Sequence, residues 1–100
     1  MQSPPDILFV MADQLTAGAL RAYGNKVCKT PHLDRLFARS TLFQQAYCNF
    51  PLCAPSRASM LTGRLASRVK VYDNACEFAA QTPTLPYYLS ALGYSTTLSG

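Results

Sequence analysis

Residues 7–14 read ILFVMADQ, an unbroken apolar run that ends in a carboxylate and an amide side chain. The length of the run and the turn-forming residues before it are typical of a strand that is buried on both faces of a parallel sheet. In open α/β sheets, ligands bind beyond the carboxyl ends of the strands. Asp13 directly follows the run, so it stands where a ligand-binding carboxylate is expected.

The positions of proline and glycine residues predict three helices further along the chain. Pro is tolerated at the first helical position, where its missing N–H group costs no hydrogen bond, and Gly is favoured just past the last turn. In the first of these segments, Leu33, Leu36 and Phe37 form one apolar helical face. The expected helices start at Thr30-Pro31, run over about residues 56–62 between Pro55 and Gly63, and extend from Thr82-Pro83 to Gly93.

Residues 41–47 and 94–99 are rich in residues that favour β-structure, and they predict two further strands. The order is then strand, helix, strand, helix, helix, strand. This order predicts an α/β fold with a mainly parallel sheet and helices on both faces. Because no crossover follows the last predicted strand, we expect residues 1–100 to be the N-terminal portion of a single larger domain whose C-terminal part is missing.

The composition excludes several classes of protein. Of the 100 residues, 49% are hydrophobic and 14% are charged, which is too apolar for a disordered segment. The net charge of +4 comes from scattered basic residues without a dense run, so we expect no nucleic-acid binding. The apolar run at 7–12 is too short for a signal segment or a membrane span, and we expect a cytoplasmic chain without membrane contact.

Four cysteines add a further constraint. Their spacing contains no Cys-x-x-Cys pair and no Cys/His pattern that suits zinc, and nothing marks the chain as a secreted disulfide scaffold. We therefore expect reduced thiols. The four are Cys28, Cys48, Cys53 and Cys76.

Residues 53–64 read CAPSRASMLTGR and contain the residues best suited to a chemical reaction. Cys53 places a thiol at the N-terminal end of the predicted helix, where backbone N–H groups and the helix dipole favour an anion or a thiolate. Arg57 and Arg64 add fixed positive charge, and the planar guanidinium of Arg57 suits a tetrahedral oxyanion. The segment therefore predicts an anion site with a candidate nucleophile.

The pattern Cys-x-Pro-Ser-Arg followed by Leu-Thr-Gly-Arg resembles the signature of the type I sulfatases, which have an alkaline-phosphatase-like α/β fold. The resemblance implies that a maturation enzyme, the formylglycine-generating enzyme, reads Cys53, Pro55 and Arg57 and converts Cys53 to formylglycine (3-oxoalanine). Cys53 and Arg57 are then the implied catalytic residues. In the mechanism that the resemblance implies, hydrated formylglycine attacks the sulfur of a sulfate ester, and Arg57 neutralises the sulfate oxygens.

The resemblance also implies a divalent metal ion, expected to be Ca²⁺. In this family the first strand ends in a carboxylate that binds the metal, and here that residue is Asp13. Many sulfatases have a second Asp next, whereas this chain has Gln14, which supplies a neutral oxygen at most. The implied metal ligands are Asp13, Gln14 and the modified Cys53, and Asn74 is the implied substrate-binding residue.

Several further segments resemble the choline sulfatases within this family. They imply hydrolysis of choline sulfate to choline and sulfate, with the small sulfate ester and the maturation enzyme as partners and a homo-oligomer as the full-length form. Phe50 departs from the pattern, because a small residue is more usual there. The segments are 11–16, 22–25, 47–49, 51–57 and 72–75.

Two other functions stay open on the sequence. A phosphonate monoester or phosphodiester hydrolase of the same superfamily shares the formylglycine, and its substrate is also a tetrahedral anion. The second alternative is an inactive α/β fragment or binding module in which Cys53 stays a thiol. Because the remaining metal ligands and the general acid are expected after residue 100, these 100 residues alone are expected to be inactive.

Overall fold

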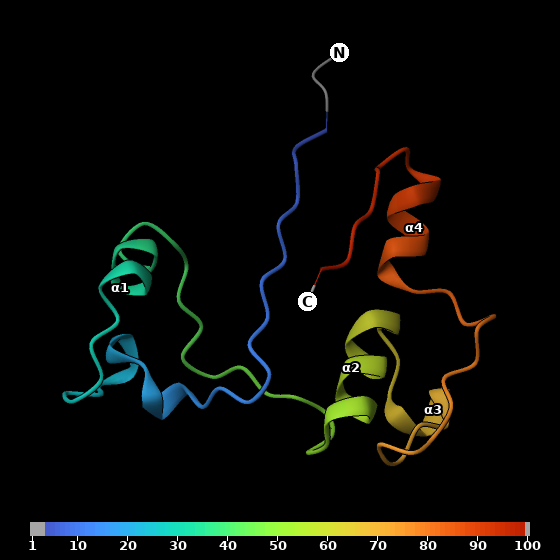
Figure 1. Cartoon of the computed structure of the whole chain (residues 1–100), viewed down its shortest axis with the longest axis horizontal. Coiled ribbons are helices and arrows are strands. Elements are labelled where there is room, and N and C mark those ends of the chain that lie inside the picture. The colour runs from blue at the N-terminus through green and yellow to red at the C-terminus, as the bar shows by residue number, and fades with distance from the viewer. Residues whose placement is uncertain (1–3, 100) are drawn as a thin grey trace. The chain divides into compact units, whose positions relative to one another are not determined.

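The computed structural model of the chain describes residues 4–99 and divides it into two compact units, Met1–Ala46 and Tyr47–Gly100 (Figure 1). Short helices are the regular structure of both units. None of the helices within residues 4–99 combines the length and the apolar character that crossing a bilayer requires.

The described residues of the first unit form three short helical pieces, and α1 contacts η2. The predicted start of α1 is confirmed, because Thr30 is its N-cap residue and Pro31 its first residue. The Thr30 hydroxyl donates a hydrogen bond to Asp34 Oδ1 at 3.0 Å, so it ties the cap to the first turn through a side chain. The pieces are η1 (Ala17–Ala19), η2 (Arg21–Tyr23) and α1 (Pro31–Phe37).

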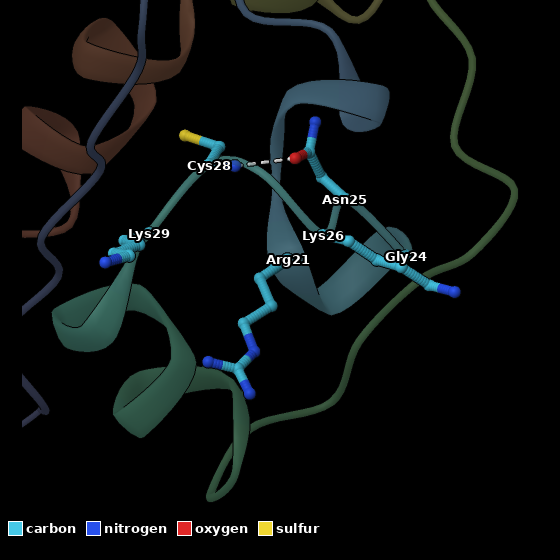
Figure 2. Close-up of a pocket in the computed structure, with 6 residues that line it drawn as sticks. All are labelled: Arg21, Gly24, Asn25, Lys26, Cys28 and Lys29. Atoms are coloured by element: carbon cyan, nitrogen blue, oxygen red, sulfur yellow. Dashed lines mark hydrogen bonds between the residues drawn. The ribbon is translucent and has the colours of Figure 1, made fainter.

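Asn25 organises the loop that leads from η2 to α1. Its Oδ1 accepts hydrogen bonds from the N–H group of Val27 at 2.9 Å and from that of Cys28 at 2.7 Å, the second of which is drawn in Figure 2. Its Nδ2 donates to the carbonyl of Gly18 at 2.7 Å. A short polar side chain that accepts from backbone groups two and three residues ahead is an Asx turn, which replaces the hydrogen bonds of regular structure.

The second unit packs α3 and α4 against α2 (Figure 1). One face of α2 is buried, and the loop after α3 adds a fully buried valine. The helices are α2 (Cys53–Thr62), α3 (Ala66–Val69) and α4 (Leu85–Ala91). The buried residues of this unit are Pro55, Ala58, Ser59, Ala66 and Val71.

The glycines that were predicted to end two helices do so. Gly63 follows α2 with φ of +65°, a left-handed conformation that residues with a Cβ adopt at a cost. Gly93, with φ of +89°, lies two residues after α4. The sequence did not predict α3, which has only four residues.

The predicted start of α2 at about residue 56 is wrong, because the helix begins at Cys53. Pro55, which the sequence places just before the helix, is its third residue. The first N–H groups of a helix have no intrahelical acceptor, so a proline there also costs no helical hydrogen bond. For the same reason α4 accepts Pro86 as its second residue and starts at Leu85, slightly later than predicted.

The three predicted strands are not strands in this structure. Residues 7–12, 41–47 and 94–99 have no β-ladder, and no strand occurs anywhere within residues 4–99. A parallel strand requires a neighbour to pair its backbone groups, and the apolar run at 7–12 is exposed, with Leu8 at 89% and Val10 at 81%. The predicted parallel sheet is therefore not confirmed by these residues.

Candidate active site

Cys53 is the first residue of α2, and its side chain is exposed. The helix begins there because Leu52 is extended, with φ of −136°, and its carbonyl accepts the first helical hydrogen bond, from the N–H of Ser56 at 3.0 Å. The first turn contains no acidic residue. The partial positive charge of the helix end is therefore not neutralised from within α2, and it favours an anion beside Cys53.

Arg57 lies four residues after Cys53 on the same helix, and it is also exposed. Side chains at i and i+4 of an α-helix lie on the same face, about 5–6 Å apart at their Cβ atoms. The opposite side of α2 carries Pro55, Ala58 and Ser59, which are buried. Packing of that face therefore turns Cys53 and Arg57 together toward the surface.

Asn74 is brought to the start of the same helix by the loop that follows α3. Its Oδ1 accepts a hydrogen bond from the N–H of Ala54 at 3.0 Å. The N–H of Ala54 is one of those that lack a helical acceptor, so Asn74 caps α2 from a distance in sequence. The structure thus unites three of the sequence-predicted site residues, Cys53, Arg57 and Asn74, at one end of one helix.

Asp73 belongs to this arrangement and was not predicted as a site residue. Its Oδ1 accepts hydrogen bonds from the N–H groups of Ala75 at 2.9 Å and Cys76 at 2.8 Å. The Cys76 thiol, followed by these two N–H groups, lowers the pKa of the Asp73 carboxyl below its ordinary value of 3.8. The signal in the sequence was the Asp-Asn pair, since Asp favours turns that it closes with its own side chain.

Asp13 and Gln14 lie in the first unit, at a bend directly after the extended run 7–12. Both side chains are exposed. Within residues 4–99, no group of three His, Cys, Asp or Glu side chains gathers in a way that could hold a metal ion. The joint metal site of Asp13, Gln14 and the modified Cys53 therefore stays a prediction.

A basic pocket in the first unit contains none of the predicted site residues (Figure 2). Its loop is the one that Asn25 organises. Arg21, on one wall, also approaches Asp34, with Nε and Oδ2 separated by 4.0 Å. The lining residues are Arg21, Gly24, Asn25, Lys26, Cys28 and Lys29.

Comparison with known proteins decides the family. A sequence profile described as Sulfatase matches residues 5–100, which is nearly the whole chain. The chain belongs to the sulfatase family. No solved structure matches it.

Characterised sulfatases of several kinds are similar to this chain. A choline-sulfatase from Rhizobium meliloti is 43% identical over 96% of the chain, and an arylsulfatase A from Bos taurus is 40% identical over 98%. A steryl-sulfatase from Mus musculus is 41% identical over 97%. The matches cover 19%, 20% and 17% of these relatives, so the chain spans about a fifth of their length.

Membership of the sulfatase family implies an alkaline-phosphatase-like fold, which was expected from the motif resemblance. Because the family uses a divalent metal ion, Asp13 and Gln14 can be compared with the ligands that such an ion requires. Carboxylate and amide oxygens are the ligands that Ca²⁺ prefers, but Ca²⁺ takes about six to eight of them. These two side chains therefore fit such an ion in kind and supply only part of its shell.

Proposed function

We propose that this chain is the nucleophile-bearing, N-terminal portion of a single sulfatase catalytic domain that hydrolyses sulfuric esters. The observation that carries the proposal is the placement of Cys53 as the exposed first residue of α2, one turn before Arg57. Membership of the sulfatase family supports the reaction class. The proposed substrate is choline sulfate.

The described residues would act on the sulfate group rather than on the alcohol. The N-terminus of α2 and the Arg57 guanidinium both favour a tetrahedral anion beside Cys53, and the guanidinium offers paired N–H donors to two of its oxygens. Such fixed donors stabilise charge that develops in a transition state without having to reorganise. Asn74 would add an amide N–H donor at the same helix end.

Two groups are required besides these side chains. We propose that a formylglycine-generating enzyme oxidises Cys53 to formylglycine, which, when hydrated, supplies the nucleophilic hydroxyl. A divalent cation, proposed to be Ca²⁺, would be held in part by Asp13 and Gln14 and would supply positive charge to the site.

Support for choline as the alcohol comes from the choline-sulfatase of Rhizobium meliloti, at 43% identity. An exposed tyrosine, Tyr72, lies two residues before Asn74, and aromatic faces attract quaternary ammonium groups. The arylsulfatase and the steryl-sulfatase are 40% and 41% identical, so the choice of alcohol depends on experiment.

The nucleophile can be tested by mass spectrometry, because trypsin is expected to release residues 40–57 as one peptide with two cysteines, Cys48 and Cys53. In the full-length protein co-expressed with the maturation enzyme, we expect this peptide to contain one alkylatable thiol and one aldehyde. Cys48 is the internal control for alkylation. An active preparation in which both cysteines are alkylated would exclude the formylglycine mechanism. An inactive preparation in which both are alkylated, from a host that modifies other sulfatases, would favour an unmodified binding module.

The substrate can be tested with pairs of esters that differ either in the alcohol or in the acid group. We expect the full-length protein to hydrolyse choline sulfate with a higher kcat/KM than an aryl sulfate, and a sulfate monoester faster than the matching phosphate diester. Preference for the aryl sulfate would contradict choline sulfate as the substrate but would still agree with sulfate-ester hydrolysis. Preference for phosphate diesters or phosphonate monoesters would assign the chain to the related hydrolases instead.

A further inference from the structure

We infer that Asp73 is a positioning residue for the nucleophile: it holds Asn74 in the loop conformation that caps α2, and it thereby fixes the helix end that carries Cys53. This inference rests on the proposed function, because it assigns Asp73 to the same site. Asp73 does not need to touch the substrate. It acts in two steps, each with hydrogen bonding from backbone N–H to a side-chain oxygen: first to Asp73, then to Asn74.

The first step is the turn that Asp73 closes. Its Oδ1 accepts the N–H groups of Ala75 and Cys76, at 2.9 and 2.8 Å, so the backbone on the far side of Asn74 is tied back to the residue before it. Asn74 lies inside this closed turn. The direction in which its side chain leaves the backbone is therefore set by Asp73.

The base of the loop is anchored independently of Asp73. Val71 is buried, with 1% of its surface exposed. The Tyr72 hydroxyl donates to the carbonyl of Ser67 in α3 at 3.4 Å. Because the loop is held at its base, loss of the Asp73 turn should change the tip around Asn74 and leave the packing of the unit in place.

The second step joins Asn74 to the helix. Its Oδ1 accepts the N–H of Ala54 at 3.0 Å, and Ala54 is the neighbour of Cys53. Helix ends fray when their first N–H groups lack acceptors. A frayed first turn would move the nucleophile relative to Arg57, and displacements of about 1 Å can lower a rate by about 100-fold.

Five variants of the full-length protein test these contacts, among them Asn74→Ala and the variant with both Asp73 and Asn74 changed to Ala. Asp73→Ala removes the acceptor, whereas Asp73→Asn keeps an oxygen in the same place. The matched control is Asn25→Ala, because Asn25 accepts N–H groups two and three residues ahead in the same way but lies in the first unit. All rates are expressed per formylglycine-containing molecule.

We expect Asp73→Ala to lower kcat by about 10- to 100-fold with a smaller change in KM. Asp73→Asn should restore most of the rate, and Asn25→Ala should leave it within about twofold. If Asp73 acts through Asn74, the variant with both changed to Ala should be no slower than Asn74→Ala alone. Additive losses, or equal losses in Asp73→Ala and Asn25→Ala, would overturn the inference.

Hydrogen exchange of the Ala54 amide separates this inference from the proposed function. We expect faster exchange of that amide in Asp73→Ala than in the wild type or in Asn25→Ala, whether or not any sulfate ester is hydrolysed. Unchanged exchange would show that Asp73 does not support the cap. Faster exchange in a protein that hydrolyses no sulfate ester would keep the positioning contact and reject the sulfatase site.

Discussion

At the scale of the residue, Cys53 differs from the other cysteines by where it stands in the backbone. Cys28 and Cys48 are exposed too, but neither begins a helix. Motif resemblance predicted Cys53, Arg57 and Asn74 as site residues, and the structure places all three at one helix end. It did not identify Asp73, because its contribution arises from turn geometry that a motif does not record.

Replacing Cys53 by Ala should remove activity without unfolding the protein. The side chain is exposed, so its loss leaves no cavity, while loss of a covalent nucleophile commonly lowers kcat by about 10³-fold or more. Turnover of choline sulfate and the thermal midpoint measure the two effects. Cys48→Ala is the matched control and should keep full activity. Substantial activity in Cys53→Ala would contradict the assignment.

Arg57→Lys should lower kcat/KM even though the charge is kept. An ammonium group cannot reproduce the paired donors of a guanidinium, so we expect a loss of about 10- to 100-fold. Steady-state kinetics with choline sulfate measure the change. Arg64→Lys serves for comparison, since Arg64 lies beyond the end of α2, and it should have a smaller effect. Similar losses in the two variants would show that only general positive charge matters.

The lowered pKa of Asp73 predicts an acid-dependent loss of stability. Its folded-state pKa lies below the ordinary value of 3.8, so the stabilisation is present above that pH and is lost as the pH falls through the folded-state pKa. Asp73→Asn cannot titrate and should lack this loss. Urea unfolding of both proteins at a series of acidic pH values checks it, and parallel curves would contradict it.

At the scale of the element, the sequence was most informative where Pro and Gly mark a boundary. The start of α1 and the end of α2 follow from these residues, whose backbone restrictions act locally, whereas α4 starts at Leu85, two residues after Pro83. The strands were predicted from composition, and strand formation depends on a pairing partner that a local pattern does not contain. The start of α2 was misplaced because Pro is acceptable anywhere in the first turn.

Gly63→Ala should destabilise the protein by about 1 kcal/mol, because a Cβ is unfavourable in the left-handed conformation that ends α2. Nothing lies within 4 Å of the added Cβ, so the cost is one of backbone conformation alone. Gly18→Ala is the matched control, since Gly18 is not in that conformation and the Cβ would meet Thr16 Oγ1 at an ordinary 3.9 Å. Chemical denaturation measures both, and equal effects would contradict the prediction.

At the scale of the whole molecule, the described residues bury little apolar surface. The buried hydrophobic residues are Leu20, Ala58, Ala66 and Val71, whereas many large apolar side chains are exposed. Domains gain most of their stability from apolar surface that folding removes from water. The sequence has few charged residues, and many of its large apolar side chains are not buried by any other part of residues 4–99.

The isolated 100-residue chain should behave as a loosely packed protein. We expect it to bind the dye ANS strongly and to unfold over a broad range of denaturant, because exposed apolar surface and few fixed contacts give these properties. Dye fluorescence and circular dichroism check this directly. A sharp, cooperative transition with no dye binding would show that these residues form a self-sufficient core.

The exposed run at 7–12 has a consequence for protein synthesis. These residues leave the ribosome before most of the described chain, and within residues 4–99 no strand pairs with them. Unpaired apolar strand edges associate with other chains, so the interval before a partner forms is a period of aggregation risk. In the proposed sulfatase domain, protection of the nascent chain by a chaperone during that interval should therefore govern the yield of soluble protein.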